Sequence, residues 1–119
     1  MQRSRARRRL CLTFLAAGLL TISLAGTALA GDAATGRKKA ARCQACHGLD
    51  GIAKMPNVPN IGGESEFYLT KQLTAFRGGE RRDPQMSAMA KNLSDEDIAD
   101  LAAYYARIEL TARIPDNLR

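Results

Sequence analysis

The amino-acid sequence predicts an all-α domain, and three observations support this fold class. Apolar residues recur at helical spacing within residues 66–77 and again within residues 94–108. No segment alternates apolar and polar residues as a half-buried strand would. Capping and stop signals flank the periodic segments, and the chain has no internal repeats or low-complexity tracts, so we expect one domain.

The first 30 residues are predicted to be a cleavable signal peptide. Five arginines lie in the first nine residues, an apolar stretch covers residues 10–25, and residues 28–30 read Ala-Leu-Ala, a small-x-small cleavage pattern. We expect cleavage after Ala30, export to the periplasm, a domain of residues 31–119 and no stable membrane insertion. The alternative is a membrane anchor left uncleaved, because the 21 residues from 10 to 30 could just span a bilayer.

Charge and size limit the kinds of function and of hydrophobic core that residues 31–119 can have. The chain has a formal charge of +6, but five of its 18 basic residues and none of its 12 acidic residues lie in the predicted signal peptide. Residues 31–119 therefore carry 13 basic and 12 acidic side chains, without a basic stripe among aromatic residues, which disfavours nucleic-acid binding. A domain of 89 residues has a marginal core, so we expect a disulfide, metal or cofactor to supplement it.

A first helix is expected from Asp32, which can cap it, to about residue 45. At its end lies the C-x-x-C-H motif of Cys43, Cys46 and His47, the only histidine of the chain. A zinc site would need four ligands, and the chain has no second cysteine pair and no other histidine to supply them. A thioredoxin-like redox motif would need a βαβ setting, and no β-rich segments surround this motif. The motif is typical of covalent haem attachment, in which two thiols form thioethers and the imidazole ligates the iron. A disulfide between the two cysteines is the remaining alternative.

Residues 55–63 contain two prolines and are expected to form a rigid, non-helical segment. An imidazole that ligates iron through Nε2 needs an acceptor for its Nδ1 proton. We predict that the backbone carbonyl of Pro59 accepts this proton from His47. A plain surface loop would show the same sequence pattern.

The sixth iron ligand is predicted to be a methionine, because a thioether is the usual soft ligand where no second histidine exists. Met55 lies only eight residues beyond His47, too close to reach the opposite face of the haem easily. Met86 and Met89 lie within residues 83–89, which begin with Asp-Pro and are expected to form a loop around the ring. One of these two is the expected ligand, and core filling is the alternative for both.

Two more helices complete the domain. Residues 66–77 are predicted to form a helix that stops at the two glycines that follow. Its apolar stripe consists of Leu69, Leu73 and Phe76. The last helix is expected to begin after Ser94, which can cap it in front of three acidic residues. Its inner stripe consists of Ile98, Leu101, Tyr105 and Ile108.

Together these residues resemble the class I c-type cytochromes, and most closely one haem domain of the cytochrome c4 group, with c5-like and c553-like monohaem proteins as near relatives. The resemblance extends from Gly31 to about Ile108. It rests on Gly-Asp at 31–32, the motif and its glycine at 43–48, Pro-Asn-Val-Pro-Asn-Ile-Gly-Gly at 56–63, and the stretches 67–79 and 86–105. The c4 proteins carry two haem domains in tandem, whereas this chain has one C-x-x-C-H motif.

The resemblance implies a class I cytochrome c fold, in which helices wrap around one covalently attached haem c. Its site residues, carried over by position, are the thioether cysteines Cys43 and Cys46 and the proximal ligand His47. They also include Pro59, whose carbonyl accepts the hydrogen bond from His47, and the distal ligand Met86, with Met89 as its rival. The first and last helices should also cross closely, with Gly36 facing Tyr104.

A six-coordinate iron held by histidine and methionine has no vacant position for a substrate. The expected function is therefore one-electron transfer between redox protein partners such as a respiratory complex, a terminal oxidase or a periplasmic dehydrogenase, and not enzymatic catalysis. Haem attachment also implies the haem maturation machinery as a partner. The alternatives are a cytochrome subunit of a periplasmic oxidoreductase with a flavin, molybdenum or sulfur-oxidising partner, and a gas sensor or peroxidase with an open sixth position.

Overall fold

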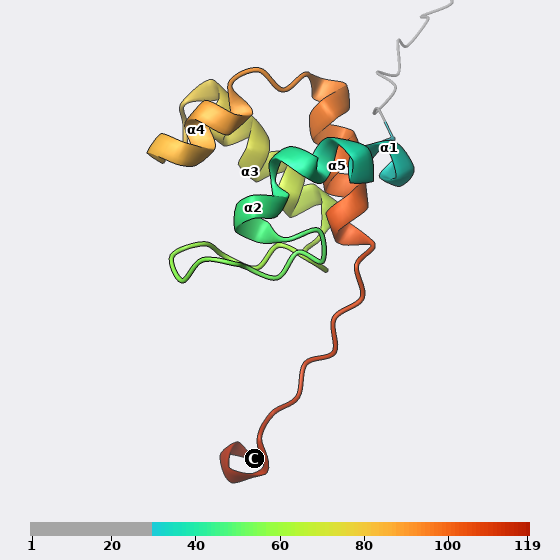
Figure 1. Cartoon of the computed structure of the whole chain (residues 1–119), viewed down its shortest axis with the longest axis vertical. Coiled ribbons are helices and arrows are strands. Elements are labelled where there is room, and N and C mark those ends of the chain that lie inside the picture. The colour runs from blue at the N-terminus through green and yellow to red at the C-terminus, as the bar shows by residue number, and fades with distance from the viewer. Residues whose placement is uncertain (1–29) are drawn as a thin grey trace, which may run out of the picture.

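The computed structural model describes residues 30–119, so all but the last residue of the predicted signal peptide lies outside the described part. The described residues form helices and no strand, which confirms the all-α prediction (Figure 1). The α-helices are α1 (Ala33–Lys39), α2 (Gln44–His47), α3 (Glu66–Gly78), α4 (Pro84–Ala90) and α5 (Asp95–Ala106), and the short 3₁₀ helices are η1 (Ala40–Arg42) and η2 (Asp116–Leu118). Within residues 30–119 no helix combines the length and the apolar character needed to cross a membrane.

Helix α1 crosses α5 at close range, and glycine makes this possible (Figure 1). A Cβ atom added at Gly36 would lie 1.9 Å from the backbone oxygen of Asp100 and 2.9 Å from the Cβ of Tyr104. The expected contact between Gly36 and Tyr104 is therefore confirmed, and it also includes the backbone of α5. No larger residue fits at this crossing without moving one helix.

Buried polar contacts fix the same crossing. Asp100, only 4% exposed, accepts hydrogen bonds from the backbone N–H of Asp32 at 2.7 Å and from the Lys39 ammonium at 2.6 Å. The same ammonium lies 2.8 Å from a carboxylate oxygen of Asp97. The hydrogen bonds that this ammonium donates lower the pKa of Asp100, and they lower the pKa of Asp97 to about 2. These contacts join both ends of α1, at Asp32 and Lys39, to the first turns of α5.

The prediction of one continuous first helix from Asp32 to about residue 45 is wrong. Helix α1 ends at Lys39, a 3₁₀ turn follows, and Cys43 precedes the separate short helix α2. Alanine and lysine favour a helix throughout this stretch, but helix ends often tighten into 3₁₀ turns. After this turn Cys43 packs against the core, so tertiary packing outweighs local propensity here.

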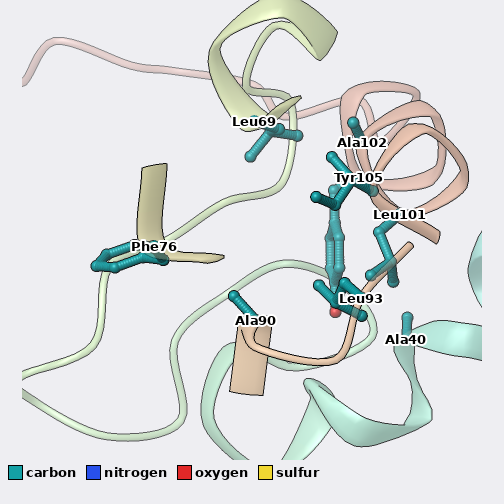
Figure 2. Packing of buried hydrophobic residues seen from close by; sticks show 9 residues of the cluster. Ala40, Leu69, Phe76, Ala90, Leu93, Leu101, Ala102 and Tyr105 are labelled. Atoms are coloured by element: carbon teal, nitrogen blue, oxygen red, sulfur yellow. The ribbon is translucent and has the colours of Figure 1, made fainter. Parts of the chain in front are cut away.

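The core lies between α3 and α5, as the two periodic segments predicted. Figure 2 shows Leu69 and Phe76 of α3 in one cluster of buried side chains with Leu101 and Tyr105 of α5. These four side chains are between 2% and 7% exposed. Ile108 follows the end of α5 but still packs against the core.

The C-terminal end of α3 and the N-terminal end of α5 lie where the sequence predicts them. Helix α3 ends at Gly78, and Gly79 takes a left-handed conformation with φ of +81°. Ser94 and Asp97 form the expected capping box, in which each side chain accepts a hydrogen bond from the other residue's backbone N–H. Both termini therefore follow from local chemistry.

The expected loop at residues 83–89 is wrong, because Pro84–Ala90 form helix α4. The Asp83 carboxylate accepts hydrogen bonds from the backbone N–H groups of Gln85 and Met86, so it caps this helix. Proline is well suited to the first helical position, where its missing N–H would have no helical partner. The Asp-Pro pair thus starts a helix instead of a loop. Residues 55–63, in contrast, are non-helical as expected, within a longer non-helical stretch of residues 48–65 that runs beside α2 (Figure 1).

Candidate functional site

A cavity of about 420 Å³ lies among α2, α3, α4, α5 and the loop before α3. Its wall contains all of the predicted site residues, namely Cys43, Cys46, His47, Pro59, Met86 and Met89. Most of the remaining wall is apolar and comes from core residues, including Leu69, Leu73, Phe76, Leu93 and Leu101. Segments far apart in the sequence therefore bring thiol, imidazole and thioether groups to one apolar chamber.

His47 is buried, with 7% of its surface exposed, and it forms the last residue of α2. Its Nδ1 atom lies 3.0 Å from the backbone oxygen of Pro59, the predicted partner. A carbonyl oxygen can only accept a hydrogen bond, so Nδ1 must carry the proton. This leaves the lone pair on Nε2 available for a metal ion in the cavity.

Cys43 and Cys46 are free thiols, and both line the cavity. The two residues lie one short turn apart, because Cys43 precedes α2 and Cys46 lies within it. Burial raises the pKa of the Cys43 thiol, so this group keeps its proton at neutral pH. Two thiols one turn apart beside an apolar chamber fit thioether bonds to a porphyrin edge.

Two tyrosines of α5 hold the chain just after the motif. The Tyr105 hydroxyl donates a hydrogen bond to the Gly48 carbonyl at 3.1 Å, and the Tyr104 hydroxyl donates to the Leu49 carbonyl at 2.8 Å. Burial raises the pKa of Tyr105, so its hydroxyl retains the proton that it donates. The helical period placed Tyr105 only in the core stripe, although a buried tyrosine hydroxyl usually needs a partner.

The two candidate methionines both lie on α4 and line the cavity. Met86 is partly buried and packs against the core, whereas Met89 is 41% exposed. The backbone N–H of Met86 donates to the Asp83 carboxylate at 2.8 Å, which fixes the first turn of α4. Met55 is 38% exposed and does not belong to the cavity wall. The structure therefore favours Met86 over Met89 as the inward-facing thioether.

Three arginines that the sequence did not mark as site residues, Arg42, Arg81 and Arg82, line the cavity together with one acidic residue, Asp83. The Arg81 guanidinium lies 4.6 Å from the centroid of the Phe76 ring. It also donates a hydrogen bond to the side-chain oxygen of Gln72 on α3. No spacing pattern joins these arginines, so only the folded chain reveals that they share one wall.

The side chains in this wall fit a covalently attached haem. Cys43 and Cys46 would hold the porphyrin, His47 would ligate the iron through Nε2, and Met86, which lines the same cavity, would supply a second ligand. The apolar wall suits a porphyrin, and the arginines supply positive charge for its carboxylates. The chemistry of the ligand set therefore agrees with the cofactor that the motif predicts.

Comparison with known proteins supports the same family. The family model described as cytochrome c oxidase, cbb3-type, subunit III, matches residues 27–104. The chain is 46% identical to cytochrome c4 of Pseudomonas aeruginosa over 99 residues, which cover 82% of this chain and 49% of that protein. It is 49% identical to cytochrome c-554(548) of Halomonas halodenitrificans over 83 residues, which cover 67% of this chain and all of that protein.

A solved structure has the same fold. The crystal structure of reduced recombinant cytochrome c4 from Pseudomonas stutzeri matches with a TM-score of 0.63 and 40% identity, covering 67% of this chain and 47% of that one. A protein named thiosulfate dehydrogenase electron acceptor, from Thiomonas intermedia, is 40% identical over 72 residues, which cover 60% of this chain and 33% of that protein.

The chain spans about half the length of the cytochrome c4 relatives, and the whole length of the cytochrome c-554(548) relative. Its sequence contains one C-x-x-C-H motif. The chain therefore belongs to this cytochrome c family, as a monohaem domain related to cytochrome c4 and cytochrome c-554(548).

Proposed function

We propose that this chain is a one-electron carrier with one haem c, attached at Cys43 and Cys46 and ligated by His47 and Met86. When bound, the haem supplies an iron that alternates between the ferrous and ferric states. The observation that carries the proposal is the cavity wall, which combines two free thiols, an imidazole fixed through Nδ1 and a thioether in one apolar chamber.

The residues of the chain hold the ligands in place before any electron arrives. The Pro59 carbonyl fixes the His47 ring, and Asp83 fixes the backbone of Met86. The packed aliphatic and aromatic residues of α3 and α5 make much of the chamber wall apolar. Because ligands held in this way move little when charge changes, the site suits electron transfer and disfavours bond-making catalysis.

The proposed partners are other redox proteins. One relative is named an electron acceptor of thiosulfate dehydrogenase, which supports a periplasmic dehydrogenase as the class of electron donor for this chain. A role as the cytochrome subunit of a sulfur-oxidising enzyme complex is the second candidate, because a solved structure of a thiosulfate dehydrogenase from Marichromatium purpuratum is also similar to this chain, with a TM-score of 0.59 and 32% identity. Co-purification distinguishes the two, since a permanent subunit should remain bound to its enzyme through gel filtration.

We further propose that residues 1–30 direct export and are removed after Ala30, so that the haem protein works in the periplasm. The charge distribution supports this, because five arginines lie in the first nine residues, ahead of an apolar stretch. N-terminal sequencing of the purified protein should begin at Gly31. A protein that starts at Met1 and remains in the membrane fraction would contradict the export proposal.

Absorption spectroscopy tests the closed iron site. The reduced protein should show the sharp bands of a low-spin c-type haem, and the oxidised protein should show the weak far-red band of methionine–iron ligation. Carbon monoxide should bind the reduced protein poorly, because both axial positions are filled. Rapid carbon monoxide binding by the native protein would instead favour the gas sensor or peroxidase alternative.

A further inference from the structure

Helix α4 carries both candidate methionines and is held at its N-terminal end from within the cavity wall. Asp83 lines the cavity and its carboxylate accepts the backbone N–H of Met86 at 2.8 Å. Helix α4 packs mainly on α3, and the chain then returns through residues 91–94 to the start of α5. The position of Met86 therefore depends also on what holds this returning segment.

One side chain holds that segment from outside the cavity. Arg77, near the C-terminal end of α3, donates from Nη1 to the Leu93 backbone oxygen at 2.9 Å and from Nη2 to the Asp95 carboxylate at 2.6 Å. Leu93 is 6% exposed and lines the cavity, whereas Arg77 does not belong to the cavity wall. One guanidinium thus joins α3 to the chain on both sides of Ser94.

The two hydrogen bonds of Arg77 differ in how much they contribute to stability. The Asp95 side chain is 85% exposed, and ion pairs with such exposed groups contribute little. The Leu93 carbonyl belongs to a buried residue, so a lost donor there leaves an oxygen that water reaches poorly. The planar guanidinium makes both bonds at once, which a lysine ammonium on its flexible stem does not reproduce.

We infer that Arg77 is a positioning residue for the distal iron ligand. By fixing Leu93 to α3, it sets the C-terminal limit of the α4 segment, while Asp83 sets the N-terminal limit, and Met86 is held between them. The inference rests on the proposed histidine–methionine haem site. It adds a residue that touches neither the cavity nor the thioether.

Arg77→Gln tests the inference, because glutamine keeps a polar side chain but loses the charge and the two-armed donor. In the oxidised holoprotein, the fraction without methionine ligation, read from the far-red band, should rise roughly tenfold, as for the loss of one charge-assisted hydrogen bond. The pH at which the band disappears should fall, and the reduction potential should fall as well, because methionine ligation raises it.

Three matched variants distinguish a positioning role of Arg77 from a general effect of losing one positive charge. Lys71→Gln removes one positive charge from an exposed position on the same helix and should leave the band unchanged. Asp95→Asn removes only the exposed ion pair and should also leave it nearly unchanged. Arg77→Lys keeps the charge and should give a partial loss of the band, and it serves as the main test if Arg77→Gln does not fold.

The outcomes are distinguishable. If Arg77→Gln and Arg77→Lys lower the unfolding free energy but keep the band, its pH midpoint and the potential of the native protein, Arg77 is only a structural residue and the inference is wrong. If the native protein itself lacks the far-red band while carrying haem, the proposed methionine ligation fails, and the positioning role fails with it.

Discussion

At Gly36, an added methyl group would meet two backbone atoms of α5, so Gly36→Ala tests the helix crossing directly. The added Cβ would lie 1.9 Å from the Asp100 carbonyl oxygen and 2.6 Å from its carbon. Both contacts are with backbone that cannot rotate away, so the overpacking cost should reach about 3 kcal/mol. Alanine gains about 1 kcal/mol of helix propensity, which leaves a net loss of about 2 kcal/mol.

The assay is thermal and denaturant unfolding of the holoprotein followed by circular dichroism. A loss of about 2 kcal/mol should lower the melting temperature by roughly 8–16 °C in a domain of this size. Gly78→Ala is the matched control, because Gly78 is also helical and an added Cβ there would meet nothing within 4 Å. The control should be neutral or slightly stabilising. Equal stability of the two variants would refute the close-crossing argument.

Three further predictions concern the site and its supports. Met86→Ala should lose the far-red band and gain carbon monoxide binding while Met89→Ala keeps the native spectrum, and the reverse pattern would make Met89 the ligand. Tyr105→Phe should lower the unfolding free energy by about 1 kcal/mol in urea titration, because the Gly48 carbonyl loses its tyrosine donor and keeps only the 3.3 Å bond from the Gly51 backbone N–H, and an unchanged midpoint would contradict this. The pKa of Asp97, about 2 when paired with Lys39 in the folded chain, lies below its ordinary value of 3.8. Its contribution to stability should thus be complete above about pH 4 and lost as the pH falls toward 2, and Asp97→Asn should flatten acid unfolding curves in that window.

Local chemistry was enough to predict the parts of the fold that depend on near neighbours. The capping box at Ser94 and the left-handed Gly79 require only residues within one helical turn, and both occur where expected. The helical period of α3 and α5 also predicted which faces form the core. Asp83 and Pro84 show the limit, because the same pair can begin a loop or cap a helix, and the packing of α4 on α3 decides.

The candidate site also contains some residues that local sequence could predict and others that it could not. The spacing of Cys43, Cys46 and His47 is contained within one helical turn, so the sequence alone could predict it. The arginines of the cavity wall and the tyrosine hydroxyl bonds join residues separated by tens of positions, and no periodic pattern marks them. Arg77 is the clearest case, because its bond to Leu93 depends on where the chain returns after α4.

Intact mass of the exported chain under denaturing conditions tests the covalent attachment of haem most directly. The protein should be produced in a host that exports it and attaches haem, with Cys43→Ala/Cys46→Ala as the matched control. We predict the mass of residues 31–119 plus one haem for the native protein, and the mass of the chain alone for the control. A native protein without added mass would contradict the account of this site.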